Sequence, residues 1–285
     1  MKEIAYYDGM IGTPQEVKIP FDDRVHFFGD GVYEAALGAG GKIFLLQEHL
    51  DRLYSSAAML DIRIPMEKEA LKALLLDLLS RADNQISMVY WQVTRGVSPR
   101  SHTYEEGMEG KVWVLIRPSS PKDPRTPVQL ITREDTRFYH CNIKTLNLLP
   151  SVMAAQAAKQ AQAAETVLHR NQTVTECSHS NVAILKDGAL ISHPNDQWIL
   201  RGITKTQMIQ DCWRLGIPVY ERTFTLEELM DADEILISSS TAFCRYADSV
   251  DGHAAGGKDP ETRQRIQRAL LEAYERETGT TCGWF

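Results

Sequence analysis

The chain has 285 residues, of which 43% are hydrophobic and 24% charged, and a chain of this size and composition can bury a core without disulfide staples. Lys and Arg total 31 against 38 Asp and Glu, and the net charge of −7 argues against a nucleic-acid partner, which selects a basic surface. No apolar run approaches the roughly 20 residues of a membrane span.

The N-terminus and the cysteines indicate a cellular compartment. Residues 1–8 include an acid and lack the apolar stretch of a signal peptide. The five cysteines are scattered, odd in number and without a C-x-x-C pair, so neither a disulfide framework nor a structural zinc site is expected. We therefore expect reduced thiols in a cytoplasmic protein.

Four prolines between residues 118 and 127 mark the clearest boundary, because prolines this close together continue neither a helix nor a central strand. The sequence predicts a small N-terminal α+β domain over 1–117, a Pro-rich linker over 118–127 and a larger C-terminal domain over 128–285.

Hydrophobic spacing predicts the elements of the first domain. In chain order they are strands 4–7 and 17–19, helices 46–59 and 68–81, and strands 87–94 and 112–116. Strands and helices grouped in this way are typical of an α+β domain.

The second domain alternates more evenly between the two kinds of element. Asp187-Gly188 between two apolar runs predicts a hairpin with a type I′ turn. The predicted elements are helix 150–165, strand 166–168, hairpin strands 181–186 and 189–192, helix 203–215, strands 219–222 and 234–238, and helix 260–278. The fold class is therefore α+β to α/β, with a mixed sheet or barrel and helices in the larger domain.

Lys144 lies among Ile143, Leu146, Leu148 and Leu149, where a charged side chain is unusual. Desolvation lowers the pKa of a lysine and frees the neutral amine that a Schiff base requires. The alternative is a lysine at a strand end that reaches toward water.

Three further segments carry candidate chemistry. Leu200–Lys205 places a glycine and Thr204 at the start of a helix, which suits either an anion or ordinary capping. Glu176 ends a strand-like run, where an inward carboxylate needs a cationic partner. The loop Arg95–His102 suits a carboxylate or is simply solvated. No H-E-x-x-H or similar spacing indicates a metal site.

Taken in order, these motifs resemble the branched-chain-aminotransferase-like family of fold type IV, whose members bind pyridoxal 5′-phosphate (PLP). The motifs are F-G-D-G-V-Y-E from Phe28, E-H-L-D-R-L from Glu48, I-K-T-L-N-L-L from Ile143, L-H-R-N-Q-T-V-T-E from Leu168, S-N-V from Ser180 and L-R-G-I-T from Leu200. The resemblance covers about Tyr7 to Ser240.

The resemblance implies a role for each matching residue. Lys144 would form the internal aldimine and move the proton at the substrate Cα, and Glu176 would pair with the pyridine nitrogen. Leu200 would pack on the ring. The phosphate would be held by Arg52, Ile203, Thr204, Ser239 and Ser240. Arg137 lies near the position of a family arginine, and Glu165 matches a family glutamate close to the lysine.

Tyr33, with Arg100 and His102 of an Arg-x-His pair, resembles most closely the members of the family that act on D-amino acids. This implies ping-pong transamination between D-amino acids and 2-oxo acids, with Arg100 and His102 receiving the substrate carboxylate. It also implies a homodimer in which their loop enters the neighbouring subunit's site.

Alternatives on the same fold are an L-branched-chain aminotransferase or an aminodeoxychorismate lyase, and a cofactor-free binding protein is a third. Cys177, His179 and Arg245 depart from the family pattern, so the preferred substrate side chain stays open.

Overall fold

The computed structural model describes residues 2–285, which fall into two compact units. The first contains residues up to 120, 143–147 and 276–280, and the second contains 121–142, 148–275 and 281–285. Residues 143–147 thus group with the first unit, whereas the expected boundaries assigned them to the C-terminal domain. The reason is that Ile143 joins the apolar core of the first unit and Thr145 forms a bridge with Val32.

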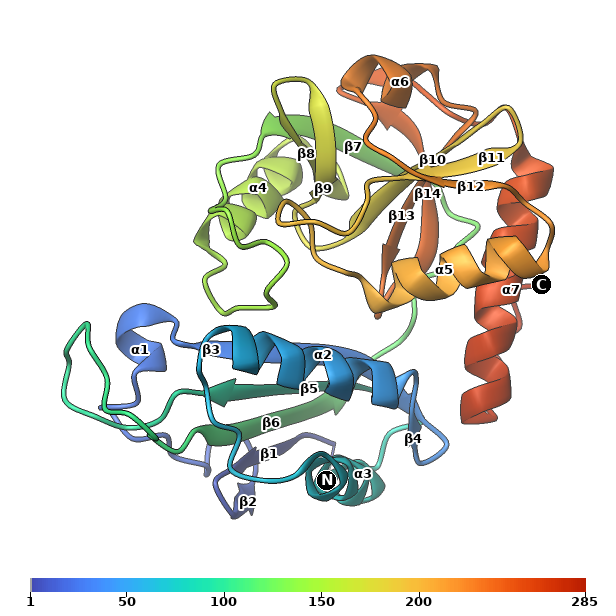
Figure 1. The fold of residues 1–285 in the computed structure, drawn as a ribbon. Helices are drawn as coiled ribbons and strands as arrows, with labels where there is room; N and C mark the ends of the chain where they lie inside the picture. Colours follow the sequence, from blue (N-terminus) through green and yellow to red (C-terminus); the bar gives the residue numbers. More distant parts are fainter. Residues whose placement is uncertain (1) are drawn as a thin grey trace. The chain divides into compact units, whose positions relative to one another are not determined.

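The first unit contains an antiparallel sheet with the order β2-β1-β6-β5-β3-β4. Its strands are β1 (Ile4–Tyr7), β2 (Met10–Gly12), β3 (Gly31–Ala39), β4 (Lys42–Ile43), β5 (Ile86–Thr94) and β6 (Lys111–Pro118). Its helices are α1 (Val25–Phe28), α2 (Leu46–Met59) and α3 (Lys68–Ser80), and α2 lies along the sheet (Figure 1).

One face of this sheet packs against α2 and α3. The core between them takes alternate residues of the strands, such as Val89 and Trp91 of β5, together with Leu50 and Leu53 of α2 and Leu75 of α3. The alternation follows from the period of two in a strand. The opposite face carries Tyr33 and Tyr90, because they are one residue out of phase with the core positions.

The second unit contains a mixed sheet with the order β12-β11-β10-β13-β14-β7-β8-β9, to which β15 adds beside β14. Its strands are β7 (Val128–Glu134), β8 (Glu165–Arg170), β9 (Thr173–Cys177), β10 (Asn181–Lys186), β11 (Ala189–Ser192), β12 (Val219–Glu221), β13 (Glu234–Ser239), β14 (Phe243–Val250) and β15 (His253–Ala254). Its helices are α4 (Leu149–Gln160), α5 (Ile203–Arg214), α6 (Leu226–Asp231) and most of α7 (Pro260–Thr278).

Most of the predicted elements are present. The hairpin is confirmed, because β10 pairs with β11 and both turn residues have positive φ, 51° at Asp187 and 73° at Gly188. The strand expected over 17–19 is wrong, since the amide of Val17 donates to the carbonyl of Thr13 in a turn. The helix expected over 150–165 ends at Gln160, and Glu165 already begins β8.

Candidate active site

Lys144 and Tyr33 are neighbours in the first unit. The Lys144 carbonyl accepts a hydrogen bond from the Tyr33 amide (3.0 Å), and the Lys144 amide donates to Ser56 Oγ of α2 (3.2 Å). The Lys144 Nζ atom lies 4.3 Å from the centroid of the Tyr33 ring, which stacks on Tyr90. The backbone contacts on both sides of Lys144 therefore fix the point from which its amine extends over Tyr33.

Arg52 is held by a buried carboxylate of β3. Its Nε and Nη2 atoms donate to the two oxygens of Glu34, each at 2.7 Å, and His49 Nδ1 lies 2.6 Å from the same carboxylate. Burial opposes the charge of Glu34, but Arg52 and His49 outweigh this effect and lower the pKa of Glu34 to about 2. Burial lowers the pKa of His49, and the neighbouring Glu34 carboxylate opposes that decrease.

Arg100 and His102 lie in an exposed loop of the first unit and both contact the Phe28 ring. Arg24, whose side chain is buried, fixes this loop. Its Nη1 atom donates to the carbonyls of Ser101 (2.7 Å) and Thr103 (3.2 Å), which flank His102. The loop is therefore exposed at its side chains but anchored through its backbone.

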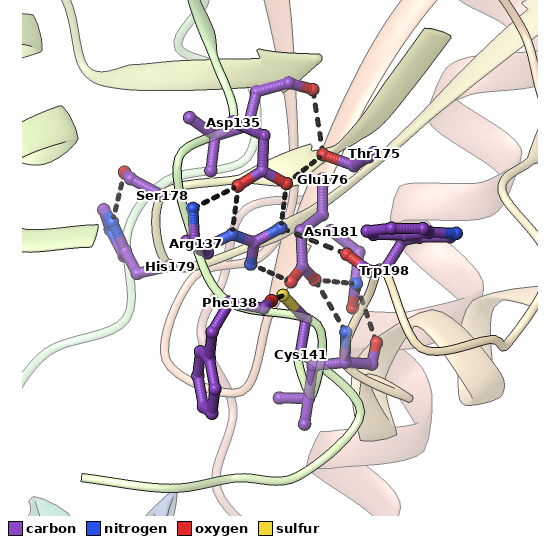
Figure 2. A network of polar contacts seen from close by, with 12 residues as sticks. Asp135, Arg137, Phe138, Cys141, Thr175, Glu176, Ser178, His179, Asn181 and Trp198 are labelled. Carbon is purple, nitrogen blue, oxygen red and sulfur yellow. Dashed lines mark hydrogen bonds and ion pairs between the residues drawn. The ribbon is translucent and has the colours of Figure 1, made fainter. Parts of the chain in front are cut away.

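Glu176 is a buried carboxylate of the second unit that accepts several hydrogen bonds. Arg137 Nη1 donates to its Oε1 atom, while Asn181 Nδ2 (2.8 Å) and the amide of Leu200 (3.1 Å) donate to Oε2. Figure 2 shows the Arg137 guanidinium between the carboxylates of Glu176 and Asp135. Burial raises the pKa of Glu176, and Arg137 and the Leu200 amide oppose that rise.

Asn181 connects Glu176 to the start of α5. Its Nδ2 atom also donates to the carbonyl of Leu200 (3.0 Å). A Cβ atom at Gly202 would lie 1.8 Å from Asn181 Oδ1, so only glycine fits at this position. The glycine of L-R-G-I-T therefore allows the backbone before α5 to lie against Asn181, whose side chain donates to Glu176.

The N-terminus of α5 suits an anion. No side chain caps the helix at Gly202, and the first N–H groups of a helix have no partner within it. Ile203 and Thr204 form its first positions, and α5 contacts β13, whose last residue is Ser239. Ser240 begins the turn that follows. The second unit thus brings together the elements that carry four of the five predicted phosphate ligands.

The residues of the second unit fit a pyridine ring that carries a phosphate. A carboxylate has about four lone-pair positions, and three N–H groups within residues 2–285 reach Glu176, which leaves one position for a protonated ring nitrogen. The uncapped helix N-terminus supplies donors for the phosphate. No group of three or more His, Cys, Asp or Glu side chains in the described part of the chain has the arrangement of a metal site.

Glu165 binds the segment that follows Cys177. It accepts hydrogen bonds from the His179 amide (2.8 Å) and Ser180 Oγ (2.6 Å), and His179 Nδ1 lies 3.1 Å from it. The His179 side chain is 64% exposed, whereas Cys177 is buried in the core of the sheet. Glu165 therefore holds the turn between β9 and β10 in place.

Sequence reasoning missed Asp135 and Arg24. Asp135 follows an ordinary strand and Arg24 precedes a four-residue helix, so neither lies in a motif. For Asp135 the available signal was charge pairing, since Arg137 lies two residues away and a buried arginine needs carboxylate partners.

A family model described as amino-transferase class IV matches residues 31–250. The chain therefore belongs to the class IV aminotransferases. The resemblance to the fold type IV family and the predicted fold class, enzyme class and PLP dependence are thereby confirmed.

Similar proteins include curated and structurally solved members of the class. A D-alanine aminotransferase of Listeria monocytogenes serotype 4b is 42% identical over 94% of both chains, and one of Bacillus licheniformis is 36% identical over 96% of this chain and 98% of that one. A branched-chain amino acid aminotransferase structure from Escherichia coli has a TM-score of 0.88 with 22% identity over 100% of this chain and 98% of that one. At that identity the likeness establishes the fold alone.

Proposed function

We propose that this protein transfers the amino group between D-amino acids and 2-oxo acids, with PLP held at Lys144. The observation that carries the proposal is the buried Glu176 carboxylate, which accepts three N–H groups and has lone-pair capacity for a further donor, as a protonated ring nitrogen requires. The D-alanine aminotransferases that are up to 42% identical to the chain over most of its length support the D-amino-acid substrate.

The proposal assigns the cofactor contacts to the residues named by the resemblance. Glu176 would accept the hydrogen bond of the protonated ring nitrogen, Leu200 would pack on the ring, and the phosphate would be held by Arg52, Ile203, Thr204, Ser239 and Ser240. When bound, PLP supplies an electron sink that stabilises negative charge at the substrate Cα. An anionic Glu176 serves this chemistry because it favours the protonated ring nitrogen.

Lys144 would both hold the cofactor and move the proton at the substrate Cα. A general acid–base group has to be fixed within hydrogen-bonding distance of the proton it moves. The contacts of the Lys144 backbone with Tyr33 and Ser56 provide that fixation, while the amine at the end of the side chain keeps its reach. Tyr33 would line the substrate side.

Arg100 and His102 would receive the substrate α-carboxylate. An arginine and a histidine on one short loop both offer hydrogen-bond donors to a carboxylate, and the arginine also matches its charge. D-selectivity would follow from the side of the cofactor ring on which this carboxylate is held, because that side decides which Cα–H bond faces Lys144.

The active species would be a homodimer, with the Arg100 loop contributed to the neighbouring subunit. Three apolar side chains of α4 form an exposed patch, since Leu149, Val152 and Met153 are 71%, 59% and 65% exposed. An apolar patch of this kind suits a protein interface, and a second copy of the chain would cover it. Light scattering should then give twice the chain mass. The structure contains five free cysteines, which agrees with the proposed cytoplasmic location. No helix among residues 2–285 is long and apolar enough to cross a membrane.

The cofactor spectrum tests the proposed reaction. The purified protein should be yellow, and D-alanine should convert its absorbance to that of the pyridoxamine form, whereas L-alanine should leave it unchanged. Conversion by L-alanine alone would overturn the D-amino-acid assignment. Release of pyruvate from aminodeoxychorismate without an acceptor would instead support a lyase.

Lys144→Ala provides the second half of this test. The variant should lose the absorbance of the bound cofactor, because the attaching amine is removed. A colourless wild-type protein that stays colourless with added PLP would contradict the cofactor assignment, and full absorbance in Lys144→Ala would contradict the role of the lysine.

A further inference from the structure

Asp135 follows β7 and has a fully buried side chain. Its amide donates to the carbonyl of His169 (2.7 Å), which fixes the backbone at that point. Its carboxylate accepts Thr175 Oγ1 (3.0 Å) and three N–H groups of Arg137. Asp135 is therefore held by hydrogen bonds with His169 of β8 and Thr175 of β9.

Arg137 is bound to Asp135 in two places. Its amide (3.0 Å) and Nε (2.9 Å) donate to Asp135 Oδ1, and its Nη2 atom donates to Oδ2 (2.9 Å). Two parallel N–H···O bonds fix the plane of a guanidinium as well as its position. The remaining terminal nitrogen, Nη1, then points at Glu176, as Figure 2 shows.

We propose that Asp135 is a positioning residue, which holds the Arg137 guanidinium against Glu176 and so keeps Glu176 available as the anionic acceptor for the cofactor ring nitrogen. The cofactor part of this role rests on the proposed function. The effect on Glu176 itself depends only on contacts within the second unit.

Arg170 supports the arrangement from the other side. Its Nη2 atom donates to the carbonyl of Arg137 (2.7 Å), and its Nε atom lies 3.3 Å from Asp135 Oδ2. The Arg170 guanidinium stacks on Trp198 at 4.3 Å, and the carbonyl of Trp198 accepts Arg137 Nη2 (3.1 Å). The Arg137 guanidinium is thus held by Asp135 and the Trp198 carbonyl, Arg170 supports Asp135 and the Arg137 backbone, and Arg137 Nη1 contacts Glu176.

Three other ionisable groups also interact electrostatically with Glu176. Cys141 comes from the segment after β7, Cys177 follows Glu176 in β9, and Lys205 comes from α5. Burial raises the pKa of both thiols, so they stay neutral while a carboxylate titrates. Lys205 stays cationic over the same range, because burial lowers its pKa only to about 8.

Asp135 affects Glu176 in two opposite ways. Its negative charge raises the pKa of Glu176 directly, after the larger effect of burial. Its two-pronged contact with Arg137 lowers the pKa of Glu176 indirectly, because it keeps a cation in contact with Glu176. Removal of Asp135 therefore lowers the Glu176 titration midpoint if only charge matters, and raises it if positioning dominates.

The test is the titration of Glu176 in the full-length Asp135→Ala variant, followed by NMR of ¹³C-labelled glutamate carboxyls. The resonance is assigned with Glu176→Gln, and each titration is run without and with added PLP. We expect the midpoint to rise by about one pH unit or more, since loss of an opposite charge in contact has an effect of this size. An unchanged or lower midpoint would overturn the proposal.

Glu234→Gln is the matched control. Glu234 is another fully buried carboxylate of the second unit, 3.0 Å from Arg263 Nε and bound to the amide of Asp259. Its loss should lower thermal stability without moving the Glu176 midpoint. A rise in both variants would show a general effect of destabilisation and overturn the positioning role.

Asp135→Asn covers the case in which the alanine variant does not fold. Its Oδ1 atom still accepts from Arg137 N and Nε, but its Nδ2 group places a donor against Arg137 Nη2, so the two-pronged contact is lost together with the negative charge. Positioning predicts a midpoint that does not fall, and charge alone predicts a lower one. With PLP bound, the acid limb of the dependence of kcat on pH should shift to higher pH in Asp135→Ala. A shifted Glu176 titration in a protein that binds no PLP would refute the proposed function and leave the positioning role intact.

Discussion

Lys205 lies in the first turn of α5 with only 1% of its surface exposed, although a cation is unfavourable at the positive end of a helix dipole. Its Nζ atom donates to the carbonyl of His193 (2.6 Å) and to Asn195 Oδ1 (3.1 Å). Both bonds hold the segment that leads to Leu200. The amine therefore fixes the approach to the cofactor ring while its charge remains costly.

This burial predicts a stability that rises with pH. Burial lowers the pKa of Lys205 to about 8 from an ordinary 10.5, so between these values the unfolded chain binds the extra proton. By linkage, the wild type should gain about 2 kcal/mol of unfolding free energy relative to Lys205→Met from about pH 7.5 to about pH 9.5. Urea unfolding of both proteins at the two pH values measures the gain, and a constant difference would contradict it.

Single residues also show what the sequence could and could not predict. Lys144 was predicted as a site residue because it lies among apolar neighbours, and Glu176 because it ends a strand-like run, each within a chain-ordered set of motifs. The role of Asp135 was not predicted, because it depends on a two-pronged contact with Arg137 and on a hydrogen bond from Thr175, which lies 40 positions away. Side chains that act through another side chain leave no local pattern.

Among the elements, the loop with Arg100 and His102 depends on a residue far away in sequence. Arg24 bonds the carbonyls on both sides of His102, and its own side chain is 3% exposed and paired with Asp30 at 2.8 Å. Arg95 pairs with the same Asp30 and stacks on Tyr104 at 3.7 Å. The loop is thus held by two buried arginines that share one carboxylate.

Arg24→Met should weaken substrate binding through this loop. With the two carbonyls released, Arg100 and His102 lose their fixed positions, and we expect KM for D-alanine to rise about tenfold or more, with PLP affinity unchanged. Arg117→Met is the control, since Arg117 lies at the surface of β6 and pairs with Glu3. Steady-state kinetics of both variants decide, and an unchanged KM in Arg24→Met would show that the loop needs no such anchor.

Elements with strong periodicity were predicted well and those with weak propensity were not. Helices α2 and α7 begin and end at the predicted residues, because their apolar spacing is regular. Strand β3 was missed, since G-V-Y-E-A-A-L-G-A is rich in Ala and Gly, which favour strands poorly. Only pairing with β5 along its whole length makes it a strand.

At the scale of the whole molecule, the predicted site residues are divided between the two units. Lys144, Tyr33, Arg52, Arg100 and His102 belong to the first, and Glu176 with the start of α5 belongs to the second. The sequence predicted Lys144 in the C-terminal domain, because Lys144 follows the Pro-rich linker along the chain. Residues 143–147 instead continue the core of the first unit through Ile143.

The proposed homodimer predicts that two inactive variants recover activity when their subunits are exchanged. Lys144→Ala and Arg100→Ala should each be nearly inactive. If the Arg100 loop serves the neighbouring subunit, a hybrid dimer has one complete site, formed by the Lys144 of one chain and the Arg100 of the other. Equal amounts that exchange subunits freely should recover about a quarter of wild-type activity, since half of the dimers are hybrids with one site of two.

Two controls make the recovery specific. Mixing Lys144→Ala with Glu176→Gln should restore nothing, because both residues would serve the same chain's site and every site in the hybrid lacks one of them. Cross-linking the subunits before mixing should abolish the recovery for the Lys144→Ala and Arg100→Ala pair. Absence of recovery after proven exchange would mean that Arg100 and His102 receive the carboxylate in their own subunit.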